Sequence, residues 1–360
     1  MTAEAPRSIR HRAATAASRA ALSRRAILKT ASATAVLTAL GGIARASLSF
    51  APDRPQITHG VQSGDVSVNS GAVWARADRP SRLLVEIATT DTFLDVQRVV
   101  FVDALPESDF TAKALIEDLP PGQDIFYRLS FQDLSTAVFG GPQAGHFRTP
   151  ASDRRSISFL WSGDTMGQGW GIDVSRGGMR SYAAMRRSEP DFFIHCGDNI
   201  YADCPIAAEQ KLPDGAIWRS IVTEDKVETR GDADYRGNYK YNLLDDNLRA
   251  FNAAVPTLAL WDNHEVMETW WPDEPLPQKP AGENNGLIFA ARARRAFHEF
   301  MAVRETPAEP GRVYRKMPYG PLLDVFMLDM RSYRGPDGAH DRIYRPDDSL
   351  LGPAQVADLH

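Results

Sequence analysis

The chain has few cysteines and no apolar run long enough to cross a bilayer. With Cys196 and Cys204 as its two cysteines among 360 residues, it cannot be a small scaffold held by several disulfides. The mild Ala/Thr/Leu-rich run at residues 30–44 is shorter than the ~20 apolar residues that a membrane-spanning helix needs. We therefore expect no stable membrane anchor and a fold that depends on its hydrophobic core.

Negative charge exceeds positive charge once the first 46 residues are set aside. The formal net charge is −5; residues 1–46 hold eight Lys and Arg against one Glu, a net of +7, so the remainder carries −12. Proteins that bind nucleic acids normally present a basic surface. The acidic remainder therefore predicts that this protein has no nucleic-acid-binding surface.

The basic N-terminus is ordered like an export signal. Arg24 and Arg25 precede the Ala/Thr/Leu-rich run, and Ala44-Arg45-Ala46 supplies an A-x-A cleavage site. This order resembles a twin-arginine signal peptide, which we predict for residues 1–46. The implied partner is the twin-arginine export machinery, and the implied location of the mature protein is periplasmic or secreted. A disordered basic tail is the alternative.

Residues 50–150 have the pattern of a small all-β domain. The segments 71–77, 82–90 and 125–131 are rich in β-branched and aromatic residues with partial alternation, and Gly/Pro-rich turns separate them. Short strands without a helical period indicate a β-sandwich. The stretch 119–129 resembles part of a fibronectin type III domain, so we expect an immunoglobulin/fibronectin-like sandwich.

Residues 156–360 have the pattern of an α/β domain. Near-continuous apolar runs at 157–162, 192–196, 257–261 and 322–328 predict strands buried on both faces. Helical segments lie between them, at 177–188, 247–254 and 284–303. The last segment has an amphipathic pattern, in which the i, i+3, i+4 rhythm is largely followed by Leu287, Ala291, Arg294, Phe297 and Met301.

Each of these four apolar runs is followed by an acidic residue: Asp164, Asp198, Asp262 and Asp329. Ligands of open α/β sheets collect beyond the carboxyl ends of the strands. Several carboxylates at one edge repel each other unless cations neutralise them. Oxygen donors accompanied by Asn and His suit hard or borderline divalent metals, or ferric iron.

Taken singly, these residues have structural explanations. Asp164 fits a turn, the run 262–265 fits a helix N-cap, His195 fits a packed core and Tyr201 fits a half-buried aromatic. Cys196 and Cys204 leave a disulfide, free thiols and a metal ligand open, and we expect a buried, free Cys196. The repetition of the pattern at corresponding strand ends favours a metal site.

The strand-end motifs together resemble the alkaline phosphatase D (PhoD-like) family of metallophosphoesterases. The resemblance is carried by residues 162–171, by FFIHCGDNIYAD at 192–203, by LALWDNHEV at 258–266 and by MLDMRSYRGP at 327–336. It implies a metallophosphoesterase-type β-sandwich flanked by helices behind the N-terminal sandwich. It also implies hydrolysis of phosphate monoesters and diesters at alkaline pH, with Fe3+ and Ca2+ as cofactors.

The resemblance also implies a role for each matching residue. Asp164 matches the ligand after the first strand, Asp198 the carboxylate that bridges two metals, Tyr201 a ligand of ferric iron and Asn263 a ligand of the second metal. Two metals bridged in this way would activate a water and stabilise the attacking and leaving oxygens.

Two further residues match positions beside the substrate. His264 matches the histidine that stabilises the charged transition state or protonates the leaving group. Arg331 is a candidate phosphate clamp, because a guanidinium can contact an oxyanion through two parallel hydrogen bonds. A structural ion pair is the alternative for Arg331.

The sequence departs from the family in several places. Ser162 stands where some members carry a cysteine, Asp262-Asn263-His264-Glu265 stands for the usual Asp-Asp-His-Glu, and no Gly-Asp-x-His motif follows Arg334. We therefore expect the C-terminal part of the metallophosphoesterase domain, which spans residues 156–360, to be missing. The main hypothesis is an exported, monomeric phosphoric ester hydrolase; the alternative is a non-catalytic or inactive truncated product. Another ester-cleaving chemistry on the same scaffold is a third possibility.

Overall fold

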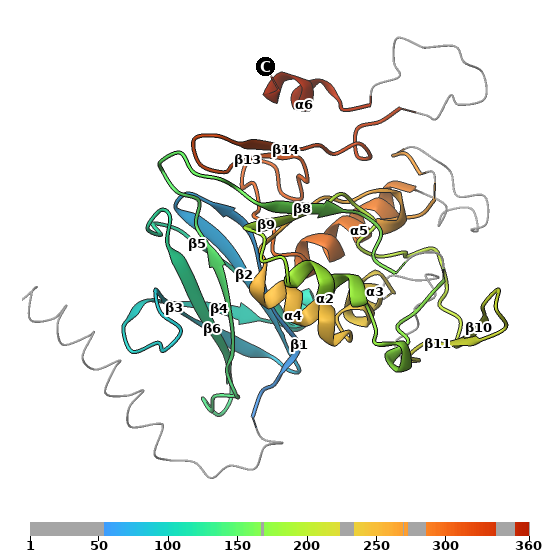
Figure 1. The fold of residues 1–360 in the computed structure, drawn as a ribbon, viewed down its shortest axis with the longest axis horizontal. Coiled ribbons are helices and arrows are strands. Elements are labelled where there is room, and N and C mark those ends of the chain that lie inside the picture. The colour runs from blue at the N-terminus through green and yellow to red at the C-terminus, as the bar shows by residue number, and fades with distance from the viewer. Residues whose placement is uncertain are drawn as a thin grey trace, which may run out of the picture. The chain divides into compact units, whose positions relative to one another are not determined.

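The computed structural model describes residues 54–166, 169–223, 234–268, 270–272, 286–335 and 350–359. The predicted signal peptide lies outside the described residues. Figure 1 shows a strand-rich part formed by the first half of the chain beside a mixed part formed by the second half. None of the helices within the described ranges is both long and apolar enough to cross a bilayer.

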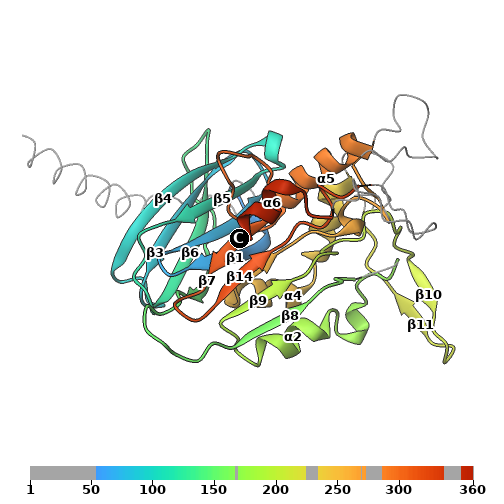
Figure 2. The ribbon, with the colours of Figure 1, turned by 90° about the horizontal axis from the view of Figure 1, so that it is seen from above.

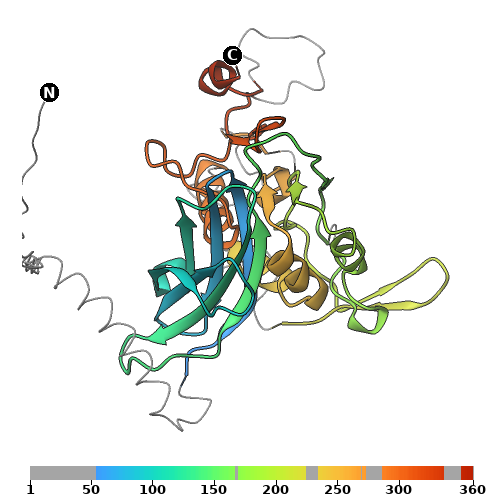
Figure 3. The ribbon, with the colours of Figure 1, turned by 60° about the vertical axis from the view of Figure 1, so that its left-hand side comes forward.

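The first half of the described chain is built almost entirely from strands. These are β1 (Ile57–Ser67), β2 (Ser70–Ala77), β3 (Ser81–Ala88), β4 (Val96–Ala104), β5 (Thr111–Ile116), β6 (Asp124–Asp133) and β7 (Gln143–Arg148), with the short 3-10 helix η2 (Pro106–Ser108). Strands β4-β3-β6-β7 form an antiparallel sheet, and β5-β2-β1 form the second layer. The predicted N-terminal β-sandwich is confirmed (Figure 3).

The core of the sandwich follows the two-residue period of its strands. Leu83, Val85 and Ile87 of β3 point inward and are fully buried, as are Ile125 and Tyr127 of β6. Successive side chains of a strand point to opposite faces, so one face of each strand meets the facing sheet. β4 is an edge strand whose side chains alternate between half-buried and exposed.

The second half alternates short strands with helices. Its elements are β8 (Phe159–Ser162), η3 (Val174–Arg176), α2 (Arg180–Arg186), β9 (Phe192–His195), β10 (Glu209–Lys211), β11 (Ile217–Arg219), α3 (Asp234–Asn242), α4 (Asp246–Ala254), β12 (Thr257–Ala259), η4 (Asn263–Glu265), α5 (Gly286–Phe300), β13 (Arg315–Pro318), β14 (Asp324–Met327) and α6 (Pro353–Asp358). β8, β9 and β12 pair in parallel, which confirms the predicted α/β class.

A single six-stranded sheet joins the two halves, in the order β5-β2-β1-β12-β9-β8. The junction is the parallel pair β1–β12, in register at Gly64 and Thr257. A Cβ atom at Gly64 would lie 2.5 Å from the carbonyl oxygens of both Thr257 and Ala302. Only glycine fits this close approach, so Gly64 allows the sandwich layer to continue into the parallel strands.

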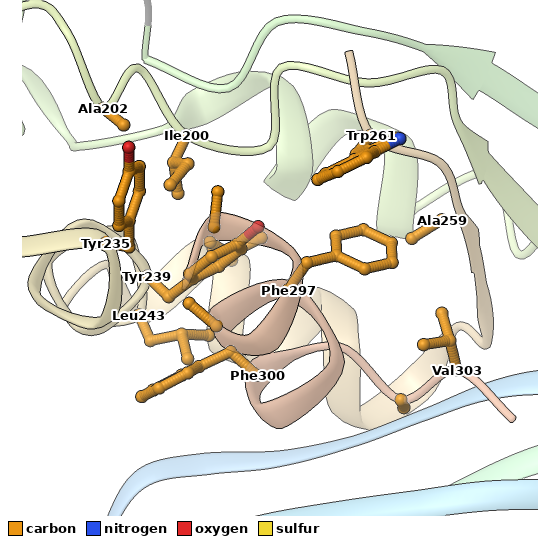
Figure 4. Packing of buried hydrophobic residues seen from close by; sticks show 14 of the residues in the cluster. Ile200, Ala202, Tyr235, Tyr239, Leu243, Ala259, Trp261, Phe297, Phe300 and Val303 are labelled. Atoms are coloured by element: carbon orange, nitrogen blue, oxygen red, sulfur yellow. The ribbon is translucent and has the colours of Figure 1, made fainter. Parts of the chain in front are cut away.

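The parallel strands β9 and β12 are covered on both faces. Phe193 and Ala259 face a cluster formed with α2, α3, α4 and α5, part of which is shown in Figure 4. Phe192 and Leu258 face the opposite side and pack on residues of the β13–β14 hairpin. Figure 1 shows this layering, with the hairpin on one side of β8 and β9 and helices α2 and α4 on the other, and Figure 2 views the same layers from above, from the hairpin side.

Three details differ from the sequence-based expectation. β8 is an edge strand, and its Trp161 is 72% exposed rather than buried. β14 pairs antiparallel with β13 in a separate hairpin and is not a strand of the six-stranded sheet. In α5 the buried face is Ala290, Ala293, Ala296, Phe297 and Phe300, whereas Leu287 is 48% exposed.

Candidate active site

Two Gly-Asp turns lie side by side at the carboxyl ends of β8 and β9. Asp164 and Asp198 both have left-handed backbones, with φ of 62° and 53°. The turns are hydrogen-bonded to each other: Thr165 N donates to the Asp198 carbonyl at 2.9 Å, and Asp164 N to the Gly197 carbonyl at 3.3 Å. Such backbones are uncommon outside glycine, and they cluster at functional sites.

Gly197 brings the second turn against the strand end of β12. Its φ is +110°, and a Cβ atom there would lie 2.4 Å from Cβ of Asp262. A glycine is therefore required for the loop after β9 to approach the loop after β12 this closely.

Three oxygen-bearing side chains meet above these turns. The Tyr201 hydroxyl donates a hydrogen bond to Asp164 Oδ1 at 2.8 Å. Burial, and then the negative charge of Asp262, raise the pKa of Asp198 to about 6, and a side-chain hydrogen bond with Asp164 adds to this rise. Burial also raises the pKa of Tyr201, reinforced by Asp164 and Asp198. We call Asp164, Asp198 and Tyr201 the oxygen cluster.

Glu265 connects the loop after β9 to the loop after β12 through hydrogen bonds in the protein interior. Its fully buried carboxylate accepts hydrogen bonds from the backbone N–H groups of Asp198 at 3.0 Å, Asn199 at 2.5 Å and Asp262 at 2.6 Å. Burial raises the pKa of Glu265 to about 8, while these donors pull it down. Asp262 and Glu265 also form a capping box at η4, so the capping explanation of residues 262–265 is correct.

His264 stands beside the oxygen cluster and is held by Asp203. Its Nδ1 lies 2.6 Å from Asp203 Oδ1, and its ring stacks on Tyr201 at 4.3 Å between centroids. Its backbone N–H donates to Asp198 Oδ1 at 3.2 Å. Burial alone would lower the pKa of His264, but the hydrogen bond and the charge of Asp203 outweigh burial and raise it.

Arg331 reaches the same edge from the loop after β14. Its Nε donates to Asp262 Oδ1 at 2.5 Å, and a terminal nitrogen donates to Asn263 Oδ1 at 3.2 Å. The backbone of Arg331 is fixed in turn by a hydrogen bond from its N–H to Asp329 Oδ1 at 2.9 Å. The guanidinium therefore forms an ion pair with Asp262 next to the predicted ligand Asn263.

The structure thus brings all six sequence-predicted site residues to one edge of the sheet. Asp164, Asp198 and Tyr201 form the oxygen cluster, and Asn263, His264 and Arg331 border it. The sequence analysis gave no site role to Asp203 and Glu265. Glu265 has the capping-box spacing as its signal, whereas nothing local to Asp203 indicates that it meets His264 61 residues away.

The two cysteines and His195 have clear positions. Cys196 and Cys204 are both free, and Cys196 is exposed, so the expectation of a buried Cys196 was wrong. The cysteine directly follows the last residue of β9, where the chain leaves the sheet. His195 is a buried core histidine whose Nε2 lies 2.7 Å from Thr165 Oγ1.

Comparison with known families agrees with this geometry. A family model described as "PhoD-like phosphatase" matches residues 159–360. The chain belongs to the PhoD-like phosphatase family. A second model, "PhoD-like phosphatase, N-terminal domain", matches residues 42–151. The resemblance seen in the strand-end motifs is therefore confirmed.

Individual relatives of this PhoD-like chain are distant. Alkaline phosphatase D of Bacillus subtilis (strain 168) is 24% identical over 313 residues, which cover 82% of this chain and 50% of the relative. A solved structure titled "Structure of PhoD" superposes with a TM-score of 0.70 at 22% identity, over 87% of this chain and 60% of that one. The superposition confirms the fold, and the chain spans about half the length of the curated relative.

A purple acid phosphatase, PPD1 from yellow lupin seeds, is structurally more remote. It has a TM-score of 0.45 and 12% identity over 74% of this chain and 43% of its own length. We draw no conclusion about fold or function from this similarity.

Proposed function

We propose that this protein hydrolyses phosphoric esters with the help of metal ions bound at the edge of the sheet. Membership of the PhoD-like phosphatase family supports the reaction class. The observation that carries the proposal is the oxygen cluster, in which two carboxylates and a phenol converge. The buried Asp198 carboxylate interacts directly with that of the exposed Asp164, and two neighbouring carboxylates repel each other unless a cation neutralises them.

The donor set fits hard metal ions. Asp164, Asp198 and Tyr201 offer oxygen atoms only, and Asn263 adds an amide oxygen at the border of the cluster. Carboxylate and amide oxygens suit Ca2+, and a phenolate is a good hard donor for Fe3+. Tyr201 and Asp164 would help to hold Fe3+, Asn263 would help to hold Ca2+, and Asp198 would contribute its carboxylate to both. When bound, these ions supply charge neutralisation of the phosphoryl group and activation of a water.

His264 is proposed to act on the leaving group. Asp203 holds Nδ1 and raises the pKa of the imidazole, which leaves Nε2 as the ring nitrogen that faces a substrate. A histidine oriented by a carboxylate in this manner can donate a proton to the departing oxygen. Asp203 then serves as a positioning residue, because it acts through His264.

Arg331 is proposed to bind the phosphoryl oxygens. Its side chain is largely buried and directed at Asp262 and Asn263, beside the oxygen cluster. The fork of a guanidinium matches two oxygens of a phosphate. On substrate binding, at least one of its hydrogen bonds would pass from Asp262 or Asn263 to the phosphoryl group.

The test is metal removal and reconstitution. Purified full-length protein is stripped with a chelator and assayed for phosphate release from an aryl phosphate monoester and a diaryl phosphate diester. We expect turnover to vanish and to return with Fe3+ and Ca2+, with bound metal measured by elemental analysis. Protein that binds both metals and releases no phosphate from either ester would contradict the proposal and favour the non-catalytic alternative.

Export through the twin-arginine route is a separate proposal. It rests on Arg24, Arg25 and the Ala44-Arg45-Ala46 site of the sequence. We expect the double substitution R24K/R25K to retain the protein in the cytoplasm, measured by fractionation of expressing cells. Export of the double variant at the wild-type level would rule out the twin-arginine route. Sedimentation of the mature protein tests whether it is a monomer.

A further inference from the structure

A second group of metal-ligand side chains lies next to the oxygen cluster. One ligand atom each of Asp203, Cys204 and His264 lies within 4.8 Å of the other two. Among the described residues this is the place where three or more His, Cys, Asp or Glu side chains converge in such a way. The group shares none of its members with Asp164, Asp198 and Tyr201. We call it the thiol cluster.

The thiol cluster is held in place before any ligand arrives. Asp203 Oδ2 accepts the backbone N–H of Glu268 at 2.6 Å, which directs Oδ1 toward His264. The His264 ring is fixed by its stacking on Tyr201. Cys204 N donates to the Tyr201 carbonyl at 3.2 Å, so a tight turn presents the thiol beside the other two groups.

The chemistry of the thiol cluster differs from that of the oxygen cluster. A thiolate, an imidazole and a carboxylate together favour borderline-soft divalent cations such as Zn2+ and Co2+ over Ca2+. Three protein ligands and a water complete a tetrahedral coordination. The side chains of His264 and Asp203 are 12% and 20% exposed, which leaves a route for an ion from solvent.

We propose that Asp203, Cys204 and His264 form a binding site for a borderline-soft divalent cation of the Zn2+ class. On binding, the ion replaces the thiol proton of Cys204 and the proton between His264 Nδ1 and Asp203, and both protons leave to solvent. The imidazolium, which carried a proton on each ring nitrogen, thereby becomes a neutral imidazole with its remaining proton on Nε2.

Occupation of the thiol cluster changes the position of His264. The present 2.6 Å between Nδ1 and Asp203 Oδ1 must widen to about 3.3 Å when both atoms bind one tetrahedral ion through bonds of about 2.0–2.1 Å. The ring therefore moves relative to Tyr201 and loses the carboxylate that orients it. As a consequence, which rests on the proposed function, Zn2+ at this site inhibits ester hydrolysis.

The site is tested first without reference to activity. The full-length protein, with the oxygen cluster loaded with Fe3+ and Ca2+, is titrated with Co2+, and the thiolate-to-cobalt charge-transfer absorption in the near ultraviolet is recorded. We expect this absorption in the wild type and in C196S, the matched control for the other cysteine, and its loss in C204S. Excess Zn2+ should remove it. A wild type without the absorption, or a C204S variant that keeps it, would overturn the site.

The inhibitory consequence is tested with the same proteins. Each variant is compared with its own zinc-free rate of phosphate release. We expect C204S to need at least ~10-fold more Zn2+ than the wild type or C196S for half inhibition, as expected for a weakened metal site. Equal sensitivity of all three proteins would overturn the inhibition. If neither the wild type nor a variant releases phosphate, the proposed function and the inhibition both fail. The cobalt absorption still shows whether the thiol cluster binds a cation.

Discussion

Three Gly-Asp pairs of this chain adopt the same backbone conformation in different electrostatic surroundings. Asp65, Asp164 and Asp198 each follow a glycine, and their φ angles are 45°, 62° and 53°. Asp65 lies within β1, in the sandwich half of the six-stranded sheet. Asp164 and Asp198 lie at the ends of β8 and β9. Asp65 and Asp198 are buried, whereas Asp164 is exposed, so the charges of the first two in particular need compensation.

Asp65 receives its compensation from the protein. Arg315 donates from Nε to Oδ2 at 2.8 Å and from a terminal nitrogen to Oδ1 at 2.6 Å, and Arg304 N donates to Oδ2 at 2.7 Å. The Arg315 side chain is 5% exposed and that of Asp65 is fully buried. This is a closed, bidentate ion pair, with a structural role.

Among the described residues, no arginine pairs with Asp164 or Asp198 in the way that Arg315 pairs with Asp65. The Tyr201 hydroxyl donates to the Asp164 side chain at 2.8 Å, and the backbone N–H of His264 donates to Asp198 Oδ1 at 3.2 Å. Local backbone conformation therefore does not distinguish a structural aspartate from a metal ligand. The two kinds of aspartate differ in whether the fold itself places a cationic side chain against the carboxylate.

The largest effect is expected from removing the bridging charge of the oxygen cluster. D198N keeps the size of the side chain but removes the carboxylate that is proposed to hold both metals. We expect the metal content to fall and kcat/KM to drop at least about 10³-fold, since several kcal/mol of transition-state stabilisation would depend on the metals. Elemental analysis and phosphate release measure the two quantities.

D153N is the matched control for D198N, because the Asp153 side chain is 74% exposed. It should leave metal content and turnover unchanged. In the metal-free protein D198N should not lower the free energy of unfolding, because it relieves repulsion. A D198N protein that binds metal and turns over like the wild type would contradict the assignment.

The next largest effect is a loss of stability when the buried Asp65 carboxylate loses its arginine partner. R315M leaves the buried Asp65 without its bidentate partner, so we expect the free energy of unfolding to fall by about 3–5 kcal/mol in urea denaturation. The exposed pair Arg82–Asp103, whose side chains are 46% and 43% exposed, gives the control R82M. That change should cost less than about 1 kcal/mol.

A double variant sharpens this test. In D65N/R315M no charge remains buried, so the loss of stability should be smaller than in R315M alone. Equal losses in the single and double variants would mean that the packing of Arg315, and not its charge, stabilises β13 against the sheet.

The sequence predicted the strand ends of the site correctly because the information there is local. An apolar run followed by Gly-Asp marks the end of a strand, and the parallel pairing of β8, β9 and β12 then gathers these ends at one edge. The partner of Asp65 could not be predicted in this way, because Arg315 lies 250 residues further along the chain.

The face of α5 shows a second limit of local patterns. The spacing of the large apolar residues favoured a face that includes Leu287 and Met301. In the structure, alanines at 290, 293 and 296 form most of the buried face. Small residues let a helix pack closely, so tertiary packing decided between two stripes that the helical period alone allows.

A smaller effect is expected at the positioning residue Asp203. D203N keeps a hydrogen-bond acceptor near His264 but removes the negative charge that favours the protonated imidazole. We expect kcat to fall about 10–100-fold, the range for residues that act through another group at a metal site. KM should change little, because Asp203 does not face the substrate. Steady-state kinetics separate the two parameters.

D118N is the matched control for D203N, since the side chain of Asp118 is 87% exposed. Its kcat should equal that of the wild type. A D203N variant with unaltered kcat would show that the Asp203–His264 hydrogen bond stabilises the loop without orienting the histidine for catalysis.

The smallest effect on catalysis is expected at Arg331, which pairs with a carboxylate and also borders the oxygen cluster. Its guanidinium pairs with Asp262 through Nε, as a cation that the fold supplies, yet it borders the oxygen cluster, where no described arginine pairs with Asp164 or Asp198. R331K keeps the charge and loses the fork, so we expect KM to rise about tenfold, or about 1.4 kcal/mol, with kcat nearly unchanged. If R331K instead lowers the free energy of unfolding and leaves KM unaltered, the ion pair with Asp262 is structural. Arg331 would then belong with Arg315, as a cation that the fold supplies for itself.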